Sequence, residues 1–311
     1  MLTLRRGVVG VVAVLLVSGI LAAGCGGSEG GNPTAPTPAP STTQAPPSVT
    51  TSSLFTFSFS AGMSLAEQDL IRNTILSGDT FFQTSMGRTI QQPTIILATT
   101  TKPLCVVETQ APGFTGGAVN GLPAEITICV GNMSWLSLTS LHKQKFLIHE
   151  LFHLVQFEMN WREEGVFDGP LGPYWIVEGA AEYVGWRGVE SMGLVTRDTA
   201  RGCNAKRASE AGAPADASLD TLEDEEGFHG VHWGFEFGML GIDQLVLSRD
   251  FPALTTYGRL QASMPWRTAF ESAFGISTTA FYSGFPSYRA GLSSLASSQG
   301  NCREDTRALF R

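Results

Sequence analysis

The sequence predicts an α+β fold, in which a small mixed β-sheet with an N-terminal helix precedes a mostly helical C-terminal part. The order of the local patterns carries this prediction. Short stretches with strand-like character lie before residue 132, and longer stretches with helical spacing of apolar residues follow it. The chain shows no internal repeat. Strands that precede a run of helices are typical of the α+β class.

The first strand and the first helix are expected between residues 54 and 85. The stretch "LFTFSFS" at 54–60 alternates large and small residues, which predicts a strand. Ser64 is followed three residues later by Glu67, the spacing of a capping box. This pattern predicts a helix that begins after Ser64 and covers residues 65–85.

Two more strands are expected on either side of a glycine-rich stretch. "PTIILAT" at 93–99 is apolar and β-branched, which predicts a core strand. "AEITICVG" at 124–131 alternates, which predicts a further strand that could lie at an edge of the sheet. The stretch "PGFTGGAVNGLP" at 112–123 between them predicts a loop.

The C-terminal part is predicted as helices with polar or glycine-rich breaks between them. Apolar residues keep helical spacing from Leu138 to Val155, and the glycines and prolines of residues 161–173 end that pattern. Residues 204–227 are polar and predict a loop. Further helices are expected at 174–189, at 233–247 and, as two helices split at Gly275, at 266–296.

The N-terminus predicts a lipoprotein signal. It has a basic start, an apolar run at 7–23 and the sequence "LAAGC", which resembles the lipobox of bacterial lipoproteins. That resemblance implies a signal peptide at 1–24 and a lipid on Cys25, with a plain secretory or anchoring segment as the alternative. Residues 25–53 are rich in Gly, Pro, Ser and Thr and predict a disordered linker. The folded domain is then expected at 54–311.

Charge and cysteine content narrow the function classes. The chain has 20 basic and 28 acidic residues, a net charge of −8, which argues against nucleic acid as a partner. Five cysteines fit an extracytoplasmic location, since lipidation of Cys25 leaves an even number for disulfides. Three pairings are possible, and we favour Cys105–Cys129, which brackets one local strand unit, with Cys203–Cys302.

The motif "HELFH" at 149–153 is the first candidate for a functional site. His149 and His153 are four residues apart, so on a helix both imidazoles face one way and can bind one metal ion. Glu150 lies about 100° around the helix, a direction suited to a water on the metal rather than the metal itself. This is the HExxH pattern of zinc proteases. The structural alternative is a pair of core histidines beside a salt-bridged glutamate.

A catalytic zinc ion takes three protein ligands, so one more must come from elsewhere. The stretch "WIVEGAAEY" at 175–183 offers Glu178 and Glu182, four residues apart on one helical face. The 25 residues from His153 to Glu178 are enough for a loop and a returning antiparallel helix. The alternative is that both glutamates lie on the surface of an amphipathic helix.

The two motifs together resemble the gluzincin metallopeptidases, and especially bacterial peptidase MA-like domains with the pattern W-x-x-E-G-x-A-x-Y. The resemblance covers about 35 residues, from His149 to Tyr183. It implies that His149, His153 and Glu178 bind Zn²⁺ and that Glu150 is the general base. It also implies that Glu182 orients a ligand histidine and that the strand at 124–130 is the edge strand that binds extended substrate.

A hydrogen-bond donor for the oxyanion is expected downstream, because the resemblance implies a His or Tyr in that role. His229 and His232 are the candidates, with Tyr183 and Tyr257 behind them, and His232 is preferred because it precedes an apolar helix. The expected protein is a zinc metallopeptidase of gluzincin-like fold that acts on peptides or proteins and is lipid-anchored to the bacterial cell envelope. The alternatives are a non-catalytic zinc-binding surface lipoprotein that serves as a binding or scaffold module, and a metal-free structural protein.

Overall fold

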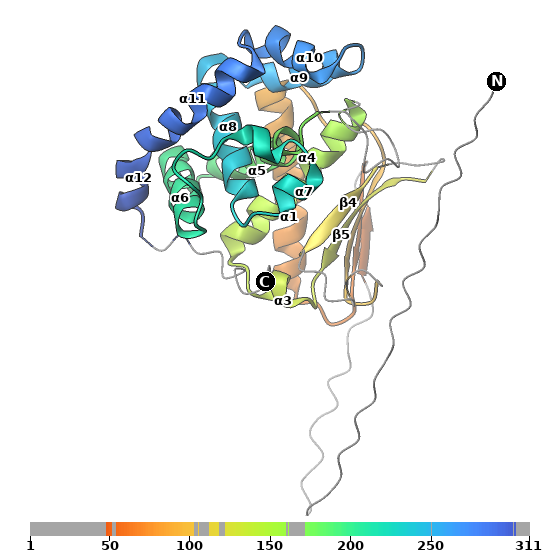
Figure 1. Cartoon of the computed structure of the whole chain (residues 1–311). Helices are drawn as coiled ribbons and strands as arrows, with labels where there is room; N and C mark the ends of the chain where they lie inside the picture. Colours follow the sequence, from red (N-terminus) through yellow and green to blue (C-terminus); the bar gives the residue numbers. More distant parts are fainter. Residues whose placement is uncertain are drawn as a thin grey trace, which may run out of the picture. The chain divides into compact units, whose positions relative to one another are not determined.

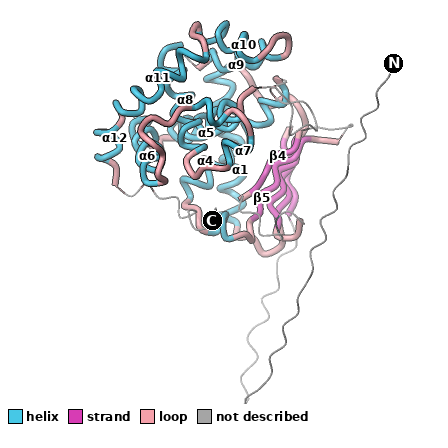
Figure 2. Tube along the Cα trace, viewed as in Figure 1, coloured by secondary structure: helices cyan, strands magenta, loops and turns pink. Residues whose placement is uncertain are grey.

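The computed structural model describes residues 48–51, 54–102, 105, 112–117, 122–159, 161, 172–249, 251–300 and 302. The expected signal peptide, Cys25 and most of the expected linker lie outside the described residues. The predicted α+β class is confirmed, and Figure 2 shows the strands gathered on one side and the helices on the other. Among the described helices, none has the length and apolar character needed to cross a bilayer.

A five-stranded mixed sheet has the strand order β1-β2-β3-β5-β4. β2, β3 and β5 are parallel to one another, whereas β1 pairs antiparallel with β2 and β4 pairs antiparallel with β5. The described sheet therefore has an antiparallel strand at each edge. The strands are β1 (Ser48–Thr51), β2 (Phe55–Phe59), β3 (Thr94–Thr99), β4 (Gly113–Gly116) and β5 (Ala124–Cys129).

The edge strand next to β5 corrects two expectations. The predicted loop at 112–123 contains β4, and the strand expected at the edge, β5, lies between β3 and β4. β4 could not be predicted from the sequence, because a four-residue stretch with glycine at both ends lacks the alternation typical of a strand. A Cβ atom at Gly113 would lie 2.3 Å from the Thr127 carbonyl oxygen, so this close pairing requires glycine. At the other edge, β1 lies within the predicted linker and pairs with β2, so the fold begins before residue 54.

One face of the sheet packs against α1 (Leu65–Met86) and α4 (Ser140–Glu158). α1 begins at Ser64, whose hydroxyl accepts from the Glu67 backbone N–H, as the capping pattern predicts. The core between these layers is apolar and almost fully buried. It includes Phe55, Phe57, Phe59, Ile71, Ile75, Phe82, Ile96, Ile126, Ile128, Leu147, Leu151 and Phe152.

Most of the other helices lie on the side of α4 away from the sheet, whereas the short α3 lies beside the sheet, directly after β5 (Figure 1). α5 packs closely against both α4 and α8. The elements are α3 (Met133–Leu136), α5 (Tyr174–Ser191), α6 (Arg197–Glu210), a 3₁₀ turn η1 (Leu219–Leu222), α7 (Glu225–His229), α8 (Gly234–Arg249), α9 (Pro252–Gln261), α10 (Trp266–Phe274), α11 (Thr278–Gly291) and α12 (Ser293–Ser298).

Two helical expectations have different outcomes. The break at Gly275 is confirmed, since this glycine ends α10 with a φ of 66°. The polar loop predicted at 204–227 is wrong at both ends, because residues 204–210 belong to α6 and residues 225–227 to α7, with the turn η1 between them. A face of small residues with Ala200 and Ala208 packs α6 against its neighbours, and Asp243 of α8 binds Arg197 and Arg201. Small residues and ion pairs hold α6 against its neighbours. Neither produces the regularly spaced apolar residues from which a helix is predicted.

Both favoured disulfides are confirmed. Cys105 pairs with Cys129 at the end of β5, with a Cα–Cα distance of 5.0 Å. Cys203 of α6 pairs with Cys302, with a Cα–Cα distance of 5.2 Å, and so fixes the last described residue to the helical part. The second bridge closes 99 residues of chain, a length at which a cross-link strongly restricts the unfolded state.

Candidate metal centre

The centre lies between two buried helices, α4 and α5. α4 begins at Thr139, whose hydroxyl accepts from the His142 backbone N–H, and α5 begins directly after Pro173. Glycines bring α5 close to its neighbours. A Cβ atom at Gly185 would lie 2.8 Å from the Lys145 carbonyl oxygen, and one at Gly179 would lie 2.4 Å from the Gly238 carbonyl carbon of α8. Larger residues would push these helices apart.

Polar side chains form two facing rows at this contact. Lys145, His149 and His153 recur every four residues on α4, so they share one face of that helix. Glu178, Glu182 and Trp186 recur with the same spacing on α5. Successive members of one row meet successive members of the other, so the i, i+4 period of both helices builds the site.

His149, His153 and Glu178 converge on one point and could hold a metal ion. The Nε2 atoms of the two histidines are 3.1 Å apart, and Oε2 of Glu178 lies 3.4 Å from His149 Nε2 and 3.5 Å from His153 Nε2. A tetrahedral centre with ligand bonds of about 2.1 Å separates its ligand atoms by about 3.4 Å. The three residues therefore fit a tetrahedral ion with one position left for a water or substrate.

The two histidines are oriented by different partners. Nδ1 of His149 lies 3.2 Å from Oε2 of Glu182, and Nδ1 of His153 lies 2.7 Å from Oε1 of Gln156. Gln156 in turn donates to the Val177 carbonyl oxygen of α5 at 2.8 Å. Donation of each Nδ1–H to these partners would leave each Nε2 lone pair for a metal ion at the shared centre.

The charges of the centre fit a divalent cation. Three buried carboxylates, those of Glu150, Glu178 and Glu182, surround neutral imidazoles, and the Lys145 ammonium is the positive group paired with Glu182. Among the described residues of the centre, carboxylates outnumber the ammonium, and a bound cation would offset this excess of buried negative charge. Buried charge of this size needs such compensation.

Without an ion, a proton takes over part of this role. Burial lowers the pKa of His149, but hydrogen bonds to Glu178 and Glu182 and the charge of Glu150 outweigh it. Together they raise the pKa of His149 to about 9. The metal-free centre therefore holds a proton on His149 at neutral pH, and a metal ion must displace it.

Glu150 lies beside the three converging residues and contacts the sheet. Its Oε2 accepts from the Thr115 hydroxyl at 2.7 Å, and its backbone carbonyl lies 3.0 Å from the same hydroxyl. Thr115 belongs to β4, so an edge strand of the described sheet contacts the residue predicted to be the general base. The carboxylate is almost completely buried.

The two downstream histidines have different surroundings. Both are exposed, and His232, the preferred donor, lies in the turn before α8. His229, at the end of α7, lies 3.3 Å from the Tyr174 hydroxyl, and Tyr174 is one helical turn before Glu178. The His229 ring also contacts the Phe235 ring, which in turn contacts His149. The described contacts thus connect His229 to the centre.

Sequence reasoning missed four residues of the centre. Lys145 and Trp186 continue the i, i+4 rows of the two motifs, and Gln156 follows His153 by three residues, so helical spacing is a signal that could have found them. Thr115 gives no such signal, because it reaches the centre from a short glycine-flanked strand.

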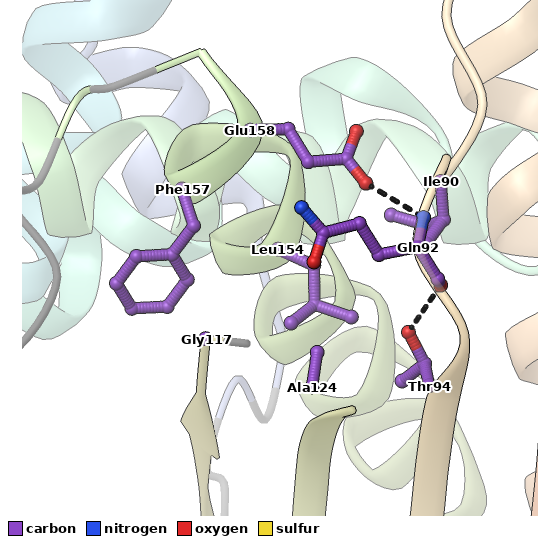
Figure 3. Close-up of a pocket in the computed structure, with 8 residues that line it drawn as sticks. All are labelled: Ile90, Gln92, Thr94, Gly117, Ala124, Leu154, Phe157 and Glu158. Carbon is purple, nitrogen blue, oxygen red and sulfur yellow. Dashed lines mark hydrogen bonds between the residues drawn. The ribbon is translucent and has the colours of Figure 1, made fainter. Parts of the chain in front are cut away.

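A small pocket of the described residues lies apart from this centre. It lies beside the last turn of α4, where Leu154, Phe157 and Glu158 face Gly117 and Ala124 (Figure 3). Glu158 Oε1 accepts there from the backbone N–H groups of Gln91 and Gln92. With a volume of about 30 Å³ it holds little more than a water molecule, so it is no substrate site.

Comparison with protein-family models, with curated proteins and with solved structures returned no match. The side-chain geometry is therefore the basis for any functional inference.

Proposed function

We propose that the protein is a zinc-dependent peptidase that hydrolyses peptide bonds. One observation carries the proposal: the ligand atoms of His149, His153 and Glu178 are separated by 3.1–3.5 Å, the spacing of a tetrahedral centre. Two imidazoles and one carboxylate are the ligand set of catalytic zinc in thermolysin-like enzymes. This set and the resemblance of both motifs to gluzincins favour zinc.

Glu150 is the proposed general base. A bound zinc ion supplies Lewis acidity that activates water and polarises the scissile carbonyl. Glu150 then accepts the proton of the attacking water and delivers it to the leaving amine. Pure metal binding does not need an acid in this place, so Glu150 argues against the rival function of a zinc-binding scaffold lipoprotein.

His229 is the proposed donor to the oxyanion. Both histidines are exposed, and the contacts of His229 with Tyr174 and Phe235 support this role for it over His232. A positioned donor stabilises charge that develops on the carbonyl oxygen only in the transition state. Tyr174, whose hydroxyl contacts the same ring, fixes the imidazole.

The substrate is proposed to be an extended peptide that pairs with β4. This strand is an edge of the described sheet, and Thr115 at its centre contacts Glu150. An edge strand offers backbone donors and acceptors to an added strand, which supplies affinity without demanding a particular sequence.

The proposed location is the outside of the bacterial cytoplasmic membrane, with a lipid on Cys25. The two disulfides support an oxidising compartment. Replacement of Cys25 by alanine is expected to move the protein from the membrane fraction to the soluble fraction of cells. Membrane retention of the Cys25→Ala protein would contradict the lipid anchor.

Activity of the purified full chain on casein and on a peptide library tests the function. We expect cleavage that a chelator abolishes and added zinc restores, about one zinc per chain, and loss of turnover in Glu150→Gln with zinc still bound. Zinc binding without any cleavage would support the scaffold alternative. Cleavage that persists with chelator, or in Glu150→Gln, would refute the mechanism.

A further inference from the structure

Lys145 is a buried lysine with no role in the proposed reaction. Its side chain is 9% exposed, and its ammonium lies 2.8 Å from Oε1 and 3.0 Å from Oε2 of Glu182. The Glu182 side chain is 5% exposed. Buried ion pairs contribute little net stability, because desolvation of both charges offsets their attraction. A pair of this kind beside a metal centre therefore suggests a function other than stability.

The hydrogen bonds of Glu182 show what the ammonium does. Oε1 accepts from Lys145 and from the Trp186 indole N–H at 3.2 Å. Oε2 accepts from Lys145 and faces Nδ1 of His149. Both oxygens are held from two directions, so the carboxylate cannot rotate about its last bond without losing contacts. Lys145 contacts both oxygens and thus fixes the plane of the carboxylate.

The position of Lys145 on α4 connects it to His149. The two residues are one helical turn apart, and both reach the same carboxylate on α5. The ammonium fixes Glu182 where its Oε2 accepts the Nδ1 proton of His149. The Nε2 atom of His149 then keeps its lone pair directed at Glu178 and His153.

We propose that Lys145 is a positioning residue of the metal centre, which acts through Glu182 to orient His149. The proposal rests on the proposed zinc site and goes beyond it. Without the ammonium, Glu182 would lose the contacts that Lys145 makes with both of its oxygens, and its carboxylate plane would no longer be fixed toward Nδ1 of His149.

The test compares the zinc affinity of four full-length variants by competition with a chromophoric chelator: Lys145→Met, Glu182→Gln, the double variant, and Lys143→Met as matched control. Lys143 lies on the same helix and pairs with Glu67 at 2.8 Å, away from the centre. We expect Lys145→Met to weaken zinc binding about tenfold or more, the range for residues behind metal ligands. Lys143→Met should bind zinc like the wild type.

The double variant decides between coupling and independent roles. If Lys145 acts through Glu182, the double variant should lose no more zinc affinity than the weaker-binding single variant. Independent roles would instead multiply the two single losses. The double variant removes both charges of the Lys145–Glu182 pair. Its zinc affinity therefore tests the proposal even where Lys145→Met alone does not fold. The visible absorption of the cobalt-substituted protein should change in Lys145→Met, because the ligand geometry changes.

Two outcomes overturn the proposal and leave the peptidase proposal standing. One is zinc affinity of Lys145→Met, or of the folded double variant, equal to that of the wild type. The other is a double variant whose loss is the product of the single losses. Failure of the wild-type chain to bind zinc would instead overturn the proposed function, and this proposal with it.

Discussion

The hydroxyl of Thr115 lies 2.7 Å from Oε2 of Glu150, and this contact joins the edge strand β4 to the helix that carries both histidines. A hydroxyl has one proton to donate, so donation to Oε2 holds that oxygen and leaves Oε1 for another partner. The strand proposed to bind substrate is therefore in contact with the proposed base.

Replacement of Thr115 by valine tests this relationship. The two side chains have similar shape, so Thr115→Val removes the hydrogen bond and keeps the packing. We expect kcat to fall about tenfold, the value of a hydrogen bond to a charged group, with KM and zinc content almost unchanged. Thr115→Ser keeps the hydroxyl and should restore most of the rate. Equal kcat in Thr115→Val and the wild type would show that the contact has no part in the reaction.

The stability of the metal-free protein should fall as pH rises from 6 to 10. The pKa of His149 is raised from 6.5 to about 9 in the folded protein, so between these values only the folded state holds the proton. The stabilisation of the folded state by this proton is complete below pH 6.5 and is lost as the pH rises through about 9. A shift of this size corresponds to a loss on the order of 3 kcal/mol.

Denaturant unfolding of the chelator-treated chain at a series of pH values measures this loss. His149→Asn removes the titrating group and should flatten the curve between pH 6 and 10. Saturating zinc should also flatten it, because the ion displaces the proton. A metal-free wild type whose free energy of unfolding stays constant over this range would contradict the prediction.

The sequence predicts those neighbours in the centre that lie on the same helix. The i, i+4 period alone places His149 beside His153, and the same period places Glu178 beside Glu182. The encounter of the two pairs depends on tertiary packing, which the length of chain between them permits and the resemblance to gluzincins implies. Lys145 escaped notice because its partner lies 37 residues away. An isolated lysine on a helix usually indicates a solvated face.

The edge strand and the downstream histidine could not be predicted from the sequence for other reasons. β4 is built around glycines that permit close backbone pairing, and such strands lack the β-branched alternation that strand prediction depends on. His229 and His232 are three residues apart, so their surroundings depend on where α7 ends. The preference for His232 assumed that the residue nearest the apolar helix faces the centre.

Gly179 should be intolerant of any side chain. It faces Gly238 at the contact of α5 with α8, where an added Cβ atom would lie 2.4 Å from the Gly238 carbonyl carbon. Gly179→Ala must separate the helices and displace the adjacent Glu178. We expect a loss of about 1–3 kcal/mol in the free energy of unfolding, as for overpacked cores, and weaker zinc binding.

Gly291 is the matched control for that substitution. It is the last residue of α11, and a Cβ atom there would meet nothing within 4 Å. Gly291→Ala should leave stability unchanged or raise it slightly, since alanine favours the helix. Similar thermal unfolding of the Gly179→Ala and Gly291→Ala proteins would show that the contact between α5 and α8 is not as close as described.

Replacement of His229 should separate its role from that of His232. His229→Ala removes the proposed oxyanion donor, so we expect kcat to fall about a hundredfold with KM and zinc content nearly unchanged. His232→Ala removes an exposed imidazole three residues away and should keep wild-type kcat. Tyr174→Phe, which removes only the hydroxyl that contacts His229, should give an intermediate loss. Steady-state kinetics with one peptide substrate measures all three, and a larger loss in His232→Ala than in His229→Ala would reverse the assignment.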